Sequence, residues 1–196
     1  MPLSVPNILT WFRILMIPVV VGVFYLPATW LSPWERNLIA CVVFAAAAIT
    51  DVLDGYLARR LNQMSAFGAF LDPVADKLMV AAALIVLVEL ARVNAVIAVI
   101  IIGREIAVSA LREWMAKIGD AKSVAVNFLG KIKTIAQMVA IPMLLYHDGI
   151  PLFDPHAVGT WLIYIAAALT LISMFYYMKL AGPRAAGAVD PRAPSR

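Results

Sequence analysis

The chain has 196 residues, of which 63% are hydrophobic and only 14% charged, and its formal net charge is +4. A typical soluble domain is about half apolar and about one quarter charged, so this composition excludes a soluble globular domain and a disordered chain. The single cysteine also excludes a disulfide-stapled secreted domain. The sequence therefore predicts an all-α integral membrane protein, with room for about six helices of ~20 residues joined by short connections.

Six apolar segments, taken in chain order, are long enough to form membrane-spanning helices. Proline, glycine and polar residues separate them, as is usual between helices. The segments lie at residues 7–26, 37–60, 67–90, 93–116, 124–146 and 157–179. We therefore expect a six-transmembrane-helix bundle that forms one membrane domain over residues 1–181. The remaining stretch, residues 182–196, is rich in Pro, Gly and Arg and is expected to be a disordered tail.

Lysine and arginine are distributed unevenly over the connections between these segments. The second and fourth connections and the C-terminal side together hold nine basic residues, whereas the first, third and fifth connections hold two. Basic residues accumulate on the cytoplasmic side of membrane proteins. Both termini are therefore expected to be cytoplasmic.

The remaining charges lie mostly inside the predicted helices, and on five helices they share a common depth. Arg13, Asp51, Asp76, Arg104 and Lys131 mark this level on the first five segments. At 1.5 Å per residue they lie ~16–23 Å from the outer edge of a ~30 Å hydrocarbon core. Ionisable residues inside a membrane are costly unless they are paired or hydrated, so they are candidate functional residues. A structural layer of ion pairs is the alternative, which the regular spacing of the acidic residues disfavours.

Four aspartates are spaced so that they occupy one face on each of two helices. Asp51 and Asp54 are three residues apart on the second segment, and Asp72 and Asp76 are four apart on the third. Four carboxylates crowded in a low dielectric would repel each other and take up protons unless cations balanced them. Oxygen-only ligands suit Mg²⁺, Mn²⁺ or Ca²⁺, and two divalent ions would balance the four charges.

A set of basic residues remains in excess once cations balance the aspartates. Its members are Arg13, Arg59, Arg104, Arg112, Lys131 and Lys133. Divalent cations combined with Arg and Lys are suited to stabilise charge on phosphate oxygens during phosphoryl or phosphatidyl transfer. A divalent-cation transporter is the alternative from another functional class, because intramembrane aspartates also mark ion paths. The excess of basic residues and the position of the charged level away from the midplane argue against transport.

Residues 51–76 resemble the signature of the CDP-alcohol phosphotransferases. The segment reads D-V-L-D-G-Y-L-A-R, then eight residues, then Gly68, Asp72 and Asp76. The resemblance implies a six-helix membrane enzyme that forms a homodimer and displaces CMP from a CDP-activated donor. Further motifs are similar to the branch of this family that uses glycerol 3-phosphate as acceptor, and they lie at residues 6–13, 67–77, 103–105, 109–114 and 130–137.

The resemblance implies a reaction and roles for individual residues. The phosphatidyl group of CDP-diacylglycerol would pass to the sn-1 hydroxyl of glycerol 3-phosphate, giving phosphatidylglycerophosphate and CMP. The four aspartates Asp51, Asp54, Asp72 and Asp76 would hold two divalent cations, Mg²⁺ or Mn²⁺. Asp76 would also act as the catalytic general base that takes the hydroxyl proton, for which one of its oxygens must stay free.

Seven further residues are candidates for the CDP-binding site: Asn7, Thr10, Gly55, Ala58, Arg59, Ser65 and Gly68. The resemblance assigns Gly55, Arg59 and Ser65 to the CDP group, and the small residues at 55, 58 and 68 allow a ligand or a neighbouring backbone to approach closely. Asn7 and Thr10 share a helix face near the cytoplasmic entrance, where they could contact the diphosphate. An N-cap role for Asn7 is the alternative.

Four basic residues are candidates for binding the phosphate of the acceptor: Arg104, Arg112, Lys131 and Lys133. Arginine can bind a phosphate through two parallel hydrogen bonds, whereas lysine attracts it with a single, compact positive charge. For Arg112 and Lys133, a surface position from which the side chain snorkels to the interface is the alternative. Inositol phosphate and serine remain alternative acceptors, although the basic residues favour a phosphorylated one.

We expect a multi-pass protein of the inner (cytoplasmic) membrane whose site faces the cytoplasm. Its expected partners are the lipid donor and glycerol 3-phosphate, and not nucleic acid.

Overall fold

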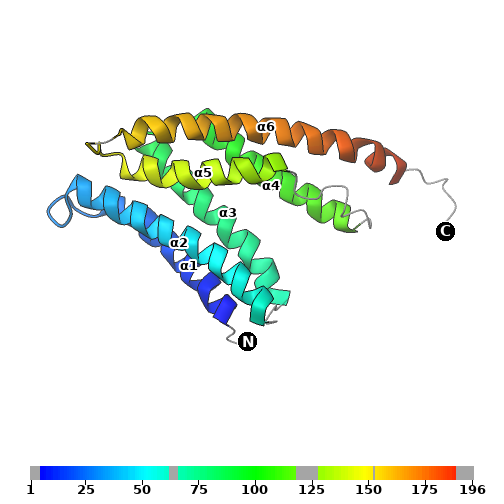
Figure 1. The fold of residues 1–196 in the computed structure, drawn as a ribbon, viewed down its shortest axis with the longest axis horizontal. Helices are drawn as coiled ribbons and strands as arrows, with labels where there is room; N and C mark the ends of the chain where they lie inside the picture. The colour runs from blue at the N-terminus through cyan, green and yellow to red at the C-terminus, as the bar shows by residue number, and fades with distance from the viewer. Residues whose placement is uncertain (1–4, 62–65, 118–127, 152, 189–196) are drawn as a thin grey trace.

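The computed structural model of the chain is a bundle of long helices (Figure 1). It describes residues 5–61, 66–117, 128–151 and 153–188, and it describes side chains over residues 8–51, 68, 70–117, 130, 132–151 and 153–179. Within these ranges it contains six α-helices and one short 3-10 helix. They are α1 (Val5–Gly22), η1 (Val23–Tyr25), α2 (Pro33–Leu61), α3 (Ala66–Glu89), α4 (Ala95–Lys117), α5 (Phe128–Tyr146) and α6 (Pro155–Ala188).

The six helices coincide with the six predicted segments, and the differences lie at their ends. Helix α2 begins at Pro33, four residues earlier than predicted, because Ser32 and Glu35 form a capping box. The Glu35 carboxylate accepts from the Ser32 backbone N–H at 2.7 Å, and the Ser32 hydroxyl accepts from the Glu35 N–H at 3.3 Å. Asp154 similarly accepts from the N–H of His156 at 2.9 Å, so α6 begins at Pro155 rather than at residue 157.

Helix α6 also extends further than expected. Its backbone is helical as far as Ala188, whereas the sixth segment was predicted to end at residue 179 and to be followed by a tail from residue 182. Residues 189–196 lie outside the described residues. Helix α5 begins at Phe128, and the start predicted for it at residue 124 falls outside the described residues as well.

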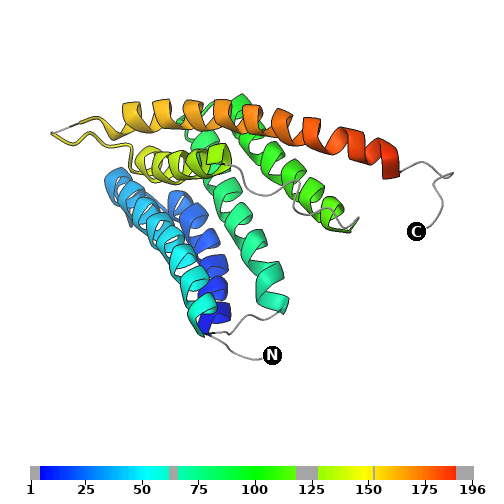
Figure 2. The same cartoon turned by 45° about the vertical axis from the view of Figure 1, so that its right-hand side comes forward.

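The helices pack as neighbouring pairs that share an apolar core. Helix α1 lies beside α2, and α5 lies beside α6 (Figures 1 and 2). The core is formed by buried side chains from all six helices, including Val20, Phe44, Leu84, Ile101 and Leu144. These residues lie between the predicted charged level and the first, third and fifth connections, so apolar packing fills that half of the bundle.

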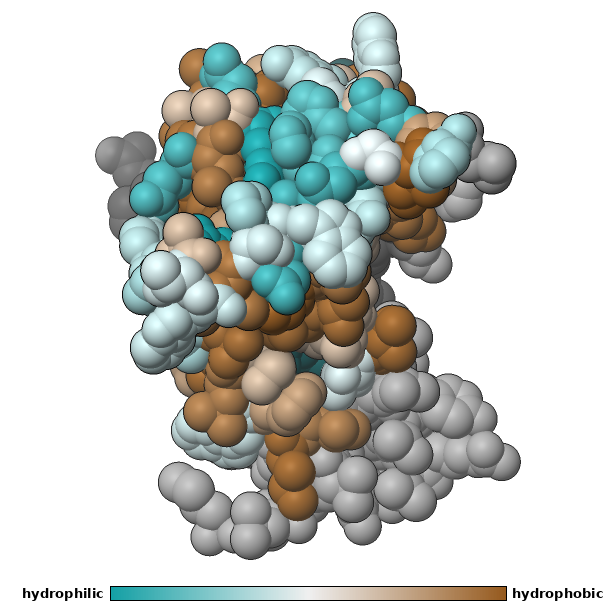
Figure 3. Space-filling model, turned by 90° about the vertical axis from the view of Figure 1, so that its left-hand side faces the viewer, coloured by the Kyte–Doolittle hydropathy of each residue, from teal (hydrophilic) through white to brown (hydrophobic). Residues whose placement is uncertain are grey.

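The first, third and fifth connections gather at one end of the bundle (Figure 1). Arg92 in the third connection donates to the backbone carbonyls of Leu144 and Leu145 at 3.2 and 2.7 Å and to Asn37 Oδ1 at 2.8 Å. Asn37 in turn donates to Asp148 Oδ2 at 2.8 Å. Viewed from this end, hydrophilic residues gather over the upper part of the surface (Figure 3). The polar contacts hold the three connections together.

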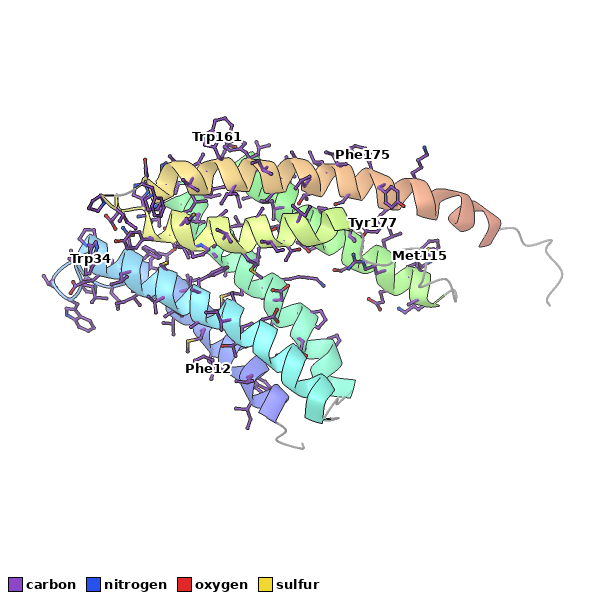
Figure 4. The ribbon with its side chains drawn as sticks, viewed as in Figure 1. Phe12, Trp34, Met115, Trp161, Phe175 and Tyr177 are labelled. Carbon is purple, nitrogen blue, oxygen red and sulfur yellow. The ribbon has the colours of Figure 1, made fainter. Side chains whose placement is uncertain are left out.

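Within the described part of the chain, two helical stretches are long and apolar enough to cross a membrane, Ile8–Tyr25 and Pro155–Lys179. A shorter apolar helix covers Ile132–Tyr146. The side chains of Phe12, Trp161 and Phe175 point away from the bundle (Figure 4), and they are 43%, 73% and 66% exposed. Large apolar side chains on the outside of a bundle are typical of a surface that faces lipid. The helical fold is thus consistent with the membrane protein that the composition predicts.

Candidate active site

Helix α1 contacts an acidic residue on each of its two neighbours, α2 and α3. Nη1 of Arg13 lies 2.7 Å from Oδ1 of Asp51 on α2, and the hydroxyl of Thr10 donates a hydrogen bond to Oδ1 of Asp72 on α3. Thr10 and Arg13 are three residues apart, so they share one helix face, and each is only 1% exposed. These contacts give buried polar groups the partners that an apolar interior demands.

The spacing of the aspartates allows adjacent antiparallel helices to bring their acidic faces together, but the side chain of Asp54 lies outside the described residues. Helix α1 packs against both α2 and α3, the two helices that carry the four aspartates. Thr10 and Arg13 on α1 therefore link Asp72 to Asp51 across the first three helices.

Asp76 lies one helical turn beyond Asp72 on α3 and lines a cavity of about 430 Å³ between α3, α4 and α5. The charges of Asp51, Glu105, Arg13 and Lys77 all act on its carboxylate. Asp76 thus belongs both to the acidic residues around α1 and to the wall of the cavity. The cavity volume lies within the range of ~300–1,000 Å³ that is usual for small-molecule sites.

The wall of this cavity carries more basic than acidic side chains. Its basic residues are Lys77, Arg104, Arg112 and Lys133, and its acidic residues are Asp76 and Glu105. Ser109 and Thr134 add two hydroxyl groups. Three of the four predicted acceptor residues are thus brought together, and the net positive charge of the wall favours an anionic ligand.

Glu105 fixes two of the basic side chains in place. Its carboxylate forms an ion pair with Lys133, and Nη1 of Arg104 lies 3.7 Å from Oε1 of the same carboxylate. Lys133 is 3% exposed and Arg104 is 5% exposed. The alternative of a surface position is therefore wrong for Lys133, which is held inside the bundle by its acidic partner.

Helix α6 orients the two arginines, a contribution that the sequence did not indicate. Nη2 of Arg104 donates to the Ser173 hydroxyl at 2.9 Å, and Nη2 of Arg112 lies 3.4 Å from the Tyr177 hydroxyl. The guanidinium groups lie 6.0 and 5.4 Å from the centre of the Tyr177 ring. Tyr177 points towards α4 and packs there near Met115 (Figure 4).

Each of the two arginines has one buried nitrogen without a hydrogen-bond partner among the described residues. These nitrogens are Nε of Arg104 and Nε of Arg112. A buried donor without a partner costs ~1–3 kcal/mol, so such groups usually mark a place where a ligand or water binds. Both arginines line the cavity. Two arginines with donors to spare in a positively charged wall fit a phosphate group in their donor chemistry.

The predicted metal ligands are described in part. The side chains of Asp51, Asp72 and Asp76 are described, whereas Asp54 is described only as part of the backbone of α2. Among the described residues, no three His, Cys, Asp or Glu side chains lie close enough together to hold one ion. The aspartates offer only carboxylate oxygens, the ligand type that Mg²⁺ and Mn²⁺ prefer, so they fit a hard divalent cation in their donor chemistry.

The remaining predicted residues are placed only by their backbone or not at all. Gly68 is buried on α3, one turn before Asp72. Five others are described only by their helical backbone: Asn7, Gly55, Ala58, Arg59 and Lys131. Ser65 lies outside the described residues altogether.

Comparison with known proteins gives a consistent result over most of the chain. Residues 3–172 match the family model of the CDP-alcohol phosphatidyltransferases, a stretch that contains every site residue predicted from the sequence. The chain is 50% identical over 183 residues to the CDP-diacylglycerol–glycerol-3-phosphate 3-phosphatidyltransferase of Shigella flexneri serotype 5b (strain 8401), which covers 92% of this chain and 96% of the relative. Proteins of the same name from Shigella boydii serotype 4 (strain Sb227) and Escherichia coli (strain K12) show the same identity and coverage.

Proposed function

The chain belongs to the CDP-alcohol phosphatidyltransferase family, and on this basis we propose that it transfers the phosphatidyl group of CDP-diacylglycerol to glycerol 3-phosphate. The products are phosphatidylglycerophosphate and CMP. Relatives named for this reaction are 50% identical to almost the whole chain. The structural observation that carries the proposal is the single cavity whose wall combines Asp76 with Arg104, Arg112 and Lys133.

The basic side of the cavity receives the phosphate of the acceptor. A phosphate monoester carries about two negative charges near neutral pH. Arg104 and Arg112 offer their Nε groups, and Lys133 adds a positive charge that Glu105 holds in place. A phosphate bound there satisfies buried donors that are otherwise without partners. Serine carries no phosphate that could accept hydrogen bonds from these donors, so the cavity wall favours a phosphorylated acceptor.

Asp76 is the general base of the proposed reaction. It lines the same cavity as the phosphate-binding residues, so the hydroxyl end of a bound acceptor can reach its carboxylate. Asp76 takes the hydroxyl proton, and the hydroxyl oxygen forms a bond to the phosphatidyl phosphorus. The bond from that phosphorus to the oxygen of CMP breaks, and CMP leaves with the bonding electron pair.

The donor is held on the opposite side of Asp76, at the acidic residues around α1. Asp51, Asp54, Asp72 and Asp76 would hold two divalent cations, Mg²⁺ or Mn²⁺, which when bound offset the charge of the diphosphate and of the departing CMP. Arg13 and Thr10 position the carboxylates of Asp51 and Asp72 through their direct contacts. The family resemblance supports a role in CDP binding for Gly55 and Arg59 on α2 and for Ser65.

We also propose that the protein works as a homodimer, as the family resemblance implies.

We further propose that both termini and the site lie on the cytoplasmic side of the inner membrane. The uneven distribution of basic residues supports this orientation. The connections with few basic residues gather at one end of the bundle, whereas α2 ends and α3 begins at the other end (Figure 1). A water-soluble acceptor then reaches the cavity from the cytoplasm, and the lipid donor arrives from the bilayer.

Purified protein tested with several acceptors provides the experiment. Protein in detergent is incubated with CDP-diacylglycerol, Mg²⁺ or Mn²⁺, and either glycerol 3-phosphate, inositol phosphate or serine, and release of CMP is measured. We expect release only with glycerol 3-phosphate. Release with inositol phosphate or serine instead would overturn the choice of acceptor. Absence of release with every acceptor, together with Mn²⁺ flux in protein-containing liposomes, would favour the transporter.

A further inference from the structure

A second cavity lies between α2 and α5 and has a different character from the first. Its volume is about 480 Å³. Most of its wall is apolar, with Ala48 and Ile49 from α2 facing Ile135, Met138 and Val139 from α5. We call this cavity the α2–α5 groove. Its size lies in the range of ~300–1,000 Å³ that is usual for small-molecule sites, and its wall suits a hydrocarbon ligand.

One end of the α2–α5 groove adjoins the candidate active site. Among the described residues of its wall, the polar ones are Asp51, a candidate metal ligand, and Thr134, which also lines the cavity that contains Asp76. The groove therefore joins the polar site directly. A molecule that occupied both would place a charged group near Asp51 and an apolar group between α2 and α5.

The groove runs from the charged level towards the middle of the membrane and opens on the outside of the bundle. On α5, its wall extends from Thr134 to Val139, a rise of ~7.5 Å at 1.5 Å per residue, in the direction of the outer connections. Ile49, Ile135 and Val139 are 61%, 64% and 42% exposed, so the groove is open along its length. A lipid in the inner leaflet has the same polarity profile, with its headgroup at the charged level and its chains towards the midplane.

We propose that the α2–α5 groove binds an acyl chain of the lipid donor and so orients its diphosphate at Asp51. This inference rests on the proposed function, because it assigns the groove to the diacyl donor of that reaction. Surrounding lipid is as apolar as the groove, so the hydrophobic effect gives little preference for either place. The groove instead acts through close van der Waals packing, which fixes the direction from which the diphosphate enters the site.

Substitutions that fill the groove test this assignment. We expect Ile49→Trp and Val139→Trp to raise the KM for dioleoyl CDP-diacylglycerol about tenfold, because the indole ring would occupy the part of the open groove in which the acyl chain packs. The KM for glycerol 3-phosphate should not change. A donor with butanoyl chains is too short to reach the level of Val139, so Val139→Trp should affect it less than the dioleoyl donor. Ile85→Trp on α3 is the matched control, because Ile85 is also 61% exposed and lines neither cavity.

Photo-crosslinking gives a readout that is independent of turnover. A CDP-diacylglycerol with a diazirine in its acyl chain is irradiated with the wild-type protein, and the crosslinked peptides are identified by mass spectrometry. We expect labelling of α2 and α5 around Ile49 and Val139 that unlabelled donor suppresses. Labelling spread evenly over all lipid-facing helices would overturn the proposal, as would normal kinetics in both groove-filling variants. A crosslink between two copies of the chain at Val139 would assign the groove to a dimer interface instead.

The two proposals fail in different ways. If the groove is labelled competitively but no acceptor releases CMP, the proposed reaction is wrong while the lipid site stands. If CMP is released with glycerol 3-phosphate but the groove is neither labelled nor sensitive to substitution, the reaction stands and the lipid site is wrong.

Discussion

Lys133 of α5 forms an ion pair with Glu105 of α4 inside the wall of the candidate acceptor cavity. Lys133 is 3% exposed, so its ammonium group depends on this carboxylate for compensation of its charge. Glu105 also lies 3.7 Å from Arg104, and it therefore holds two cationic groups in one wall. The acidic residue thus positions the basic ones, and the wall remains positive overall because Lys77 and Arg112 add further charge.

Loss of the lysine should weaken acceptor binding specifically. In Lys133→Ala, the carboxylate of Glu105 loses its ion-pair partner inside the cavity and repels the acceptor phosphate. Hydrogen bonds to charged groups contribute ~1.5–3 kcal/mol, so we expect the KM for glycerol 3-phosphate to rise about 10- to 100-fold. Steady-state release of CMP at saturating donor measures this.

Lys133→Arg is the matched control, since it keeps the positive charge and should retain most of the acceptor affinity. A rise in the KM for CDP-diacylglycerol with no change for glycerol 3-phosphate would place Lys133 at the donor instead.

Removal of the proposed base should stop turnover without unfolding the protein. In Asp76→Asn the side chain keeps its shape but can no longer accept the hydroxyl proton. General bases contribute about 10²- to 10⁴-fold, so we expect kcat to fall by at least about 100-fold. CMP release gives the rate, and size-exclusion chromatography together with helical circular dichroism checks the fold. Retention of more than about a tenth of the wild-type kcat would show that another group takes the proton.

Divalent cations should bind at the aspartates even in the absence of substrate. A ligand at about 100 times its dissociation constant stabilises a protein by ~2.7 kcal/mol, so Mn²⁺ should raise the Tm of the wild type. Asp51→Asn should lose this shift, because it removes one carboxylate of the proposed site. EDTA should abolish CMP release, and added Mg²⁺ or Mn²⁺ should restore it.

Glu113→Gln serves as the control for the metal experiment. Glu113 is an exposed acidic residue that pairs with Lys117 at 2.9 Å on α4, and it lines neither cavity. We expect this variant to keep the full Mn²⁺ shift. An undiminished shift in Asp51→Asn would mean that the ion binds elsewhere.

The helical framework was predictable from the sequence because it depends on long apolar runs, but several helix ends were not. Hydropathy predicts that α2 starts at residue 37, whereas the Ser32-x-x-Glu35 capping box starts it at Pro33. Local hydrogen bonds of this kind decide where a helix starts, whereas hydropathy shows only where a helix is buried. Asp154 caps α6 in the same way and moves its start to Pro155.

The charged residues of the site were also predictable, whereas the residues that position them depended on tertiary structure. Thr10 and Asp72 are 62 positions apart, and no periodicity shows that α1 lies against both α2 and α3. Ser173 and Tyr177 lie in a segment that reads as uniformly apolar. Their one detectable signal is a spacing of four residues, which places two hydroxyl groups on the same face of α6.

The polar contacts of Arg92 at the far end of the bundle should stabilise the fold without affecting turnover. Arg92 joins the third connection to α5 and α2 through hydrogen bonds to Leu144, Leu145 and Asn37. Arg92→Ala leaves two carbonyls and the Asn37 side chain without these donors, so we expect it to destabilise the protein by ~2–4 kcal/mol. The kcat should stay within about twofold of wild type at a temperature where both are folded, because neither Arg92 nor the residues that it contacts line either cavity.

Lys117→Ala is the comparison: its ion pair with Glu113 is more than two-thirds exposed on both sides, and exposed pairs contribute ~0–1 kcal/mol. Thermal unfolding in detergent measures both variants. Equal stability of the two would mean that the outer contacts are dispensable, and a large loss of kcat in Arg92→Ala would mean that the outer end is coupled to the site.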